Sequence, residues 1–174
     1  MSEVTPTVGH KIALDCMGGD LGPADAVAGA ALAIREGIVG PEDMLILVGH
    51  EDNLRLLAMD NRILNHKRIQ FRHAPGVVNP DDAAMTVIKS KRDSSMVIAL
   101  EMLKAGEVDA VVSTGNTKAL VAAGTIKVRA MEGAERPALA AIMPRREGHF
   151  VLLDVGANPE AKPEHLLHNA VLGS

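Results

Sequence analysis

Val111-Val-Ser-Thr-Gly-Asn-Thr117 joins an expected strand to an expected helix. Residues 109–112 form a short apolar run, which predicts a buried strand, and a helical pattern of apolar residues begins at Asn116 or Thr117. The polar tip at 113–117 therefore lies between a strand and a helix. The first N–H groups of a helix lack partners within it and lie at the positive end of its dipole. This loop therefore predicts an anion site, with phosphate as the expected ligand.

The side chains of this loop support two interpretations. Gly115 lets the backbone approach a ligand closely. Polar side chains around it can hydrogen-bond a phosphate or carbonyl oxygen, and these belong to Ser113, Thr114, Asn116 and Thr117. Such residues are also ordinary helix N-caps, so capping stays open as an alternative. The order Gly-Asn-Thr-Lys departs from the P-loop pattern, which disfavours a Walker-type NTPase.

The same order of strand, polar loop and helix recurs along the chain. Apolar runs at 11–16 and 44–48 are followed by loops at 17–20 and 49–53, and each loop leads into a helical pattern. Several of the runs are apolar on both faces, as in parallel sheets that helices cover on both sides. We therefore predict an α/β fold, a three-layer αβα arrangement around a mostly parallel, doubly wound, Rossmann-like sheet.

Further elements extend this pattern. Residues 68–73 alternate between apolar and polar, which places that strand towards a sheet edge. Strands are also expected at 138–143 and 150–154, and Pro163 begins a last helix. Loops that follow parallel strands meet at one edge of the sheet, where ligands bind. The loops expected to converge there are 17–20, 49–53, 113–117 and 154–158.

Length and composition limit the class of protein. The 174 residues suffice for one domain, predicted over 11–174 after a flexible tail at 1–10. The apolar runs are far shorter than the roughly 20 residues of a membrane helix, and no signal-peptide pattern opens the chain, so we expect a cytoplasmic protein. A net charge of −4 and the absence of Trp and Tyr argue against nucleic-acid binding.

Reactive side chains give few further candidates. The single cysteine, Cys16, excludes an internal disulfide and follows a buried strand, so a packed thiol is favoured over a nucleophile. Asp15, Asp20 and Asp154 lie near the expected ligand-binding edge. Each could position a hydroxyl, a water or a metal, but a turn or capping role is favoured for each one. No metal site and no cofactor are expected.

A short basic run lies at 89–92, with Lys89, Lys91 and Arg92. A solvated surface is the simplest interpretation, and a docking patch for an acidic partner or phosphate is the alternative. Asp93 or Ser94 can cap the helix that follows this run.

Motifs quoted in chain order connect these features. They are Ile12-Ala-Leu-Asp-Cys-Met-Gly-Gly-Asp20, Lys91-Arg-Asp-Ser-Ser-Met96, Ser113-Thr-Gly-Asn-Thr117, Arg136-Pro-Ala-Leu-Ala140, and Leu153-Asp-Val-Gly-Ala-Asn158 with Lys162-Pro-Glu-His-Leu166. Together they resemble the phosphate acyltransferase (PlsX) family of bacterial phospholipid synthesis. The resemblance runs from about Lys11 to Ser174 and covers the N-terminal half of that family's longer chains.

The resemblance implies a fold and an activity. Members of this family have a phosphotransacetylase-like fold and transfer a fatty acyl group from acyl carrier protein to inorganic phosphate, giving acyl-phosphate. It further implies a homodimer and peripheral association with the membrane. One departure concerns the residue after Asn-Thr, which is usually glycine in the family and is Lys118 here.

Roles for individual residues follow from the loop chemistry and the resemblance together. Asn116 and Asp20 are the catalytic candidates, with Asn116 or a loop N–H stabilising the oxyanion that forms on the thioester. The expected phosphate-binding residues are Gly18, Gly19, Ser113, Thr114, Gly115, Thr117 and Lys118. The expected contacts to substrate or carrier protein are Lys91, Arg92, Ser94, Ser95, Asp154 and Asn158.

Two other functions are weighed against this one. The chain could be a non-catalytic α/β module that binds phosphate or carrier protein without turnover. A dinucleotide-dependent enzyme is disfavoured, because Met17-Gly-Gly-Asp20 lacks the Gly-x-Gly-x-x-Gly spacing.

Overall fold

The computed structural model describes residues 9–130, 137–158 and 160–173. The chain forms two compact units, Met1–Ala123 and Gly124–Ser174, and each is considered by itself. A single domain over 11–174 and a flexible tail at 1–10 stay predictions, and most of that tail lies outside the described residues.

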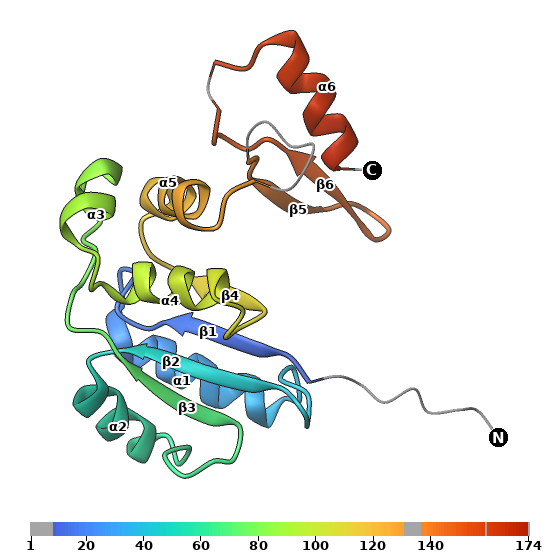
Figure 1. The fold of residues 1–174 in the computed structure, drawn as a ribbon. Helices are drawn as coiled ribbons and strands as arrows, with labels where there is room; N and C mark the ends of the chain where they lie inside the picture. Colours follow the sequence, from blue (N-terminus) through green and yellow to red (C-terminus); the bar gives the residue numbers. More distant parts are fainter. Residues whose placement is uncertain (1–8, 131–136, 159, 174) are drawn as a thin grey trace. The chain divides into compact units, whose positions relative to one another are not determined.

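A four-stranded sheet forms the middle of the first unit (Figure 1). Its strands are β1 (Lys11–Asp15), β2 (Met44–Gly49), β3 (Ile69–His73) and β4 (Ala110–Ser113), in the order β3-β2-β1-β4. Every neighbouring pair is parallel. The predicted parallel α/β sheet is therefore confirmed, and β3 lies at an edge, as its alternating sequence predicted.

Helices cover both faces of this sheet (Figure 1). On one face, α1 (Gly22–Arg35) and α2 (Glu51–Asp60) pack against the side of β2 that carries Leu47. On the other face, α4 (Ser95–Lys104) packs against Ile46 and Val48 of the same strand. Successive residues of a strand point to opposite faces, so β2 is buried on both sides and the three-layer arrangement is confirmed.

Two shorter stretches complete the region around the sheet edge. Helix α5 (Thr117–Lys127) begins directly after the loop that follows β4, as predicted. Helix α3 (Ala84–Ser90) begins later than the helical pattern from residue 79 predicted. The physical reason is a local turn, in which the Asn79 N–H donates to the Asp82 carboxylate at 2.7 Å and diverts the backbone from a helix.

The second unit contains β5 (Ala140–Pro144), β6 (His149–Leu153) and α6 (Pro163–Leu172). Both strands lie where the sequence predicted, but they pair antiparallel in a two-stranded sheet of their own. Parallel neighbours need a crossover of roughly a dozen residues or more, whereas only a short turn joins β5 to β6. The loop 154–158 therefore does not follow a strand of the parallel sheet. The prediction that it joins the other loops assumed such a strand, and this assumption is wrong. Among the described residues, no helix is long and apolar enough to cross a membrane.

Candidate functional site

The loops after β1 and β4 touch at the carboxyl end of the parallel sheet. A Cβ atom added at Gly18 would lie 2.9 Å from the Cα of Gly115, closer than side-chain atoms normally approach backbone. The end of β2 also meets the loop after β1, since a Cβ at Gly49, the last residue of β2, would lie 2.8 Å from the side chain of Met17. The predicted convergence at the ends of β1, β2 and β4 is confirmed, and glycine is needed at Gly18 and Gly115, where two backbones meet.

A buried carboxylate joins these loops to helix α4. Asp15 is only 1% exposed, and its carboxylate accepts hydrogen bonds from Ser95 Oγ at 2.5 Å and Ser113 Oγ at 2.7 Å. It also accepts the N–H groups of Met17 at 3.3 Å and Gly18 at 3.2 Å. We call these five residues the Asp15 cluster. It ties together the end of β1, the loop after it, the start of α4 and the end of β4.

Asn116 organises the start of α5. Its Oδ1 accepts the N–H of Ala119 at 3.0 Å, which is the geometry of an N-cap. Its Nδ2 donates to the carbonyl oxygens of Pro80 at 2.8 Å and Asp82 at 3.2 Å. Both amide hydrogens are therefore used within the protein, and capping, one of the two predicted interpretations, describes what this side chain does.

The backbone N–H groups at this helix start divide into two sets. Gly115 N donates to Ser113 Oγ at 3.1 Å. Within the described part of the chain, the N–H groups of Asn116, Thr117 and Lys118 have no protein acceptor. These are the unpaired donors that a helix N-terminus offers to an anion.

A polar pocket of about 760 Å³ adjoins these N–H groups. Its walls are the loop after β1, the segment 77–84 and the loop 114–118. The predicted site residues that line it are Gly19, Asp20, Thr114, Gly115, Asn116, Thr117 and Lys118. Asp20, Thr117 and Lys118 are exposed, so their side chains are accessible to a ligand.

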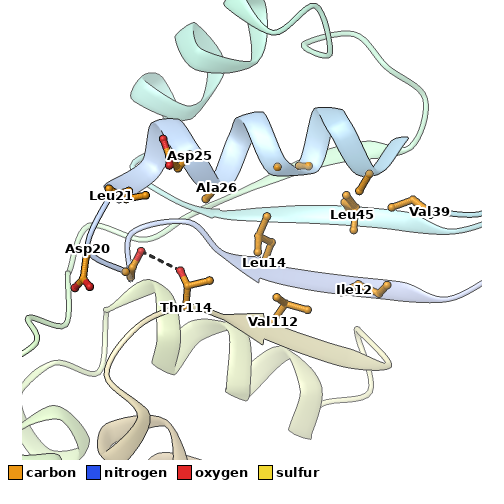
Figure 2. Close-up of a pocket in the computed structure, with 16 residues that line it drawn as sticks. Ile12, Leu14, Asp20, Leu21, Asp25, Ala26, Val39, Leu45, Val112 and Thr114 are labelled. Carbon is orange, nitrogen blue, oxygen red and sulfur yellow. Dashed lines mark hydrogen bonds between the residues drawn. The ribbon is translucent and has the colours of Figure 1, made fainter. Parts of the chain in front are cut away.

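An apolar pocket of about 650 Å³ lies beside the polar one, between α1 and the sheet (Figure 2). Figure 2 shows it bounded by Leu14 and Ala26, with Thr114 towards one end and Val39 towards the other. The two pockets share Gly19, Asp20 and Thr114. At this junction Gly19 has a φ of +89°, and Thr114 Oγ1 donates a long hydrogen bond of 3.5 Å to the Gly18 carbonyl.

Comparison with known proteins identifies the family. Residues 10–174 match the model of a family described as "Fatty acid synthesis protein". The chain belongs to this family. The curated relatives named "Phosphate acyltransferase" include proteins from Desulfitobacterium hafniense, 40% identical over 164 residues, and Halalkalibacterium halodurans, 42% identical over 165 residues. A third, from Bacillus cereus, is 44% identical over 166 residues.

These relatives are longer than the present chain. Each alignment covers 94% of this chain but 47% of the relative from D. hafniense, 47% of that from H. halodurans and 48% of that from B. cereus. The chain therefore spans about half the length of the curated relatives that it matches.

Half of the motif at 91–96 is buried, namely residues 94–96. Ser94 is 0% exposed and donates to the Lys91 carbonyl at 2.7 Å, while Ser95 belongs to the Asp15 cluster. Ser94 is the N-cap residue of α4 by position, but its side chain makes no capping bond. Neither hydroxyl is placed to contact a carrier protein directly.

Lys91 is also engaged within the protein. Its Nζ donates to the Val77 carbonyl at 2.9 Å and forms an ion pair with Asp82. This contact, together with the N–H of Asn79, holds the pKa of the Asp82 carboxyl below its usual value. Lys91 therefore fixes the segment 77–82 at the wall of the polar pocket, and Arg92 is the exposed residue of the predicted contact set in this run.

Asp154 and Asn158 organise a loop within the second unit. The Asp154 carboxylate accepts N–H groups of Leu139, Gly156, Ala157 and Asn158, and also the Asn158 side-chain amide. Burial opposes ionisation, but these donors outweigh it and lower the pKa of Asp154 to about 2. Asn158 Nδ2 also donates to the Pro137 carbonyl, whereas Arg136 of the same family motif lies outside the described residues.

Cys16 and Asp15, at the end of β1, were both considered in the sequence analysis as candidate residues. Cys16 is buried as predicted, and burial, reinforced by the Asp15 charge, raises its pKa to about 12, which makes it a poor nucleophile at neutral pH. Asp15 fills the favoured turn role, since it accepts the N–H groups of Met17 and Gly18, but it also accepts two distant hydroxyls, which the sequence analysis did not predict. The available signal was a carboxylate ending an otherwise apolar strand.

Proposed function

We propose that this chain carries the phosphate and acyl binding sites of an acyltransferase that moves a fatty acyl group from acyl carrier protein to inorganic phosphate. The observation that supports it is the junction of a polar and an apolar pocket at Gly19, Asp20 and Thr114, in a chain whose relatives are named phosphate acyltransferases. A phosphate in one pocket and an acyl chain in the other would bring nucleophile and carbonyl carbon together.

Phosphate is proposed to bind at the start of α5. The N–H groups of Asn116, Thr117 and Lys118 have no protein acceptor among the described residues, and the Thr117 hydroxyl and Lys118 ammonium line the same pocket. A helix N-terminus and a cation both favour a dianion. Ser113 and Gly115 would act indirectly, because their groups already bond to one another and to Asp15.

The reaction is proposed to need placement and electrostatic stabilisation rather than an enzyme nucleophile. A phosphate oxygen attacks the thioester carbonyl carbon, the new C–O bond gives a tetrahedral oxyanion, and the C–S bond then breaks with its electron pair leaving on sulfur. A loop N–H stabilises the oxyanion. Asp20, exposed at the junction of the pockets, can accept a hydrogen bond from a phosphate hydroxyl and orient the attack.

The acyl donor is proposed to approach through its acidic carrier protein. Arg92 and Lys89 are exposed, so they can attract an acidic partner at low ionic strength, whereas Lys91 is held by Asp82. Homodimer formation, peripheral membrane association and a cytoplasmic location belong to the same proposal.

Calorimetry with inorganic phosphate tests the binding step. We expect phosphate to bind the chain, and we expect Lys118→Ala and Thr117→Ala each to weaken binding about three- to tenfold through loss of one charge-assisted contact. Lys67→Ala, an exposed lysine outside the polar pocket, is the matched control. Phosphate affinity that is equal in all four proteins would reject the site.

A turnover assay separates the enzyme from a binding module. The module is the second candidate, because the chain spans about half the length of its relatives. Acyl carrier protein loaded with a fatty acyl group is mixed with phosphate and the chain, and acyl-phosphate is trapped with hydroxylamine. Product that depends on phosphate supports the transferase, whereas phosphate binding without product under any condition supports the module.

A further inference from the structure

The charge of Asp15 is balanced in an unusual way for a buried carboxylate. The residue is 1% exposed, and no cation pairs with it among the residues that the structure describes. Its compensation comes from two hydroxyls and two backbone N–H groups. Burying a carboxylate is costly, and an apolar residue would fill this position more cheaply, so its presence indicates a role beyond packing.

The carboxylate also fixes the direction of the hydrogen bonds around it. An ionised carboxylate only accepts, so Ser113 directs its hydroxyl hydrogen towards Asp15 and presents a lone pair elsewhere. That lone pair accepts the Gly115 N–H at 3.1 Å. These two hydrogen bonds, which join Asp15, Ser113 and Gly115, therefore orient the loop immediately before the N–H groups of 116–118 without using those N–H groups.

Two further bonds of the cluster, from the Ser95 hydroxyl and the Gly18 N–H, link Asp15 to α4 and to the loop after β1. Ser95, at the start of α4, is 80 residues from Asp15, and Ser113 is 98 residues from it. The Gly18 N–H belongs to the loop that lines the apolar pocket. One carboxylate thus holds the loops that border both pockets.

We propose that Asp15 is the positioning residue of the phosphate site, an inference that rests on the proposed function. By accepting the Ser113 and Ser95 hydroxyls, it presets the loop after β4 against the loop after β1, so that phosphate meets donors already in place.

Asp15→Asn tests this role with little change in volume. The asparagine Nδ2 is a donor where an acceptor is required, so the Ser113 hydroxyl has to reverse and the loop loses its fixed direction. We expect the dissociation constant for inorganic phosphate to rise about tenfold or more. We also expect faster hydrogen exchange at the Gly115 and Gly18 amides than the change in global stability explains.

Asp43→Asn is the matched control. Asp43 also accepts two backbone N–H groups, from His10 and Gly40, both at 2.8 Å, but it lies before β2 at the other end of the strands. This variant should lose stability while keeping phosphate affinity and the exchange of Gly115 unchanged relative to global unfolding.

Ser95→Ala and Ser113→Ala keep the carboxylate and serve if Asp15→Asn does not fold. Each should weaken phosphate binding and speed exchange at Gly115. Unchanged affinity in these folded variants, or exchange that rises only as far as in Asp43→Asn, would overturn the proposal. If the unsubstituted chain binds no phosphate, the proposed function fails, and the exchange comparison alone then decides whether Asp15 orders the loop.

Discussion

Asp15 and Asp154 both stand at the end of a strand, yet their carboxylates organise the two units in different ways. The donors to Asp154 come from residues 156–158 and from Leu139, only 15 residues away. The hydroxyl donors to Asp15 are 80 and 98 residues away. The Asp154 loop is therefore local to a hairpin, whereas the Asp15 cluster exists only when the parallel sheet has assembled.

Among the substitutions that test this comparison, Gly18→Ala should have the largest effect on stability. The new Cβ would lie 2.8 Å from Asp15 Oδ2 and 2.9 Å from the Cα of Gly115. The carboxylate is held by the buried Asp15 cluster, and the Gly115 Cα is backbone, so neither atom can move away easily. We expect a loss of about 2–3 kcal/mol in the free energy of unfolding, together with loss of phosphate binding. Urea unfolding and calorimetry measure the two effects.

Gly29→Ala provides the control for that substitution. Gly29 lies within α1, and a Cβ there meets no atom within 4 Å. Alanine should stabilise this helix by about 0.5–1 kcal/mol. Equal destabilisation by Gly18→Ala and Gly29→Ala would contradict the close contact of the two site loops.

Acid should weaken the Asp154 loop in a defined pH window. The folded pKa of about 2 lies below the ordinary 3.8, so the carboxylate stabilises the unit above about pH 4 and loses this contribution as the pH falls towards 2. Asp154→Asn should therefore cost about 1–2 kcal/mol near neutral pH, after allowance for solvent screening.

Hydrogen exchange at the Leu139 and Ala157 amides measures this cost across the pH range. The difference between Asp154→Asn and the unsubstituted chain should shrink as the pH approaches 2. A difference that stays constant from pH 7 to pH 2 would show that ionised Asp154 does not hold the loop.

The same contrast between local and distant contacts explains what the sequence could predict. The order of strands and helices follows from runs of apolar residues, so β1, β2 and β4 lie close to their predicted positions. The convergence of Gly18 and Gly115 follows from a general rule for parallel sheets. The separate antiparallel pair of β5 and β6 was not predicted, because an apolar pattern says nothing about a strand's neighbour, although the short turn between them favours an antiparallel partner.

Side-chain partners were less accessible to sequence reasoning. Lys91 and Ser95 were predicted to contact substrate or carrier protein, but Lys91 pairs with Asp82 and Ser95 donates to Asp15. The contact of Ser95 depends on how α4 packs against the sheet, and that of Lys91 depends on how the segment 77–82 folds against the end of α3. Asn116 was predicted both as a ligand and as a cap, and only coordinates could show that its amide is fully used by 80, 82 and 119.

Two substitutions at Asn116 separate its capping role from its role as a donor. Asn116→Asp keeps an oxygen for the Ala119 N–H but loses both donations to the segment at 80–82, whereas Asn116→Ala loses all three bonds. We expect the alanine variant to be less stable than the aspartate variant by about 1 kcal/mol. Thermal unfolding at neutral pH measures this difference, and equal stability of the two would show that the cap contributes nothing.

The smallest effect on stability is expected at Lys91, whose contacts are intermediate in range. Its Nζ reaches Val77 and Asp82, 14 and 9 residues away, and its side chain is 25% exposed. Partly exposed ion pairs contribute little, so Lys91→Met should lower the free energy of unfolding by less than about 1 kcal/mol.

The segment 77–82 should nevertheless be cleaved faster by a protease in Lys91→Met, because this segment loses its contact with Lys91 while the Asp15 cluster stays intact. Lys89→Met, an exposed neighbour in the same basic run, should leave cleavage unchanged. Faster cleavage in both variants would show that the positive charge of residues 89–92 protects the segment, and not the contact between Lys91 and the pocket wall.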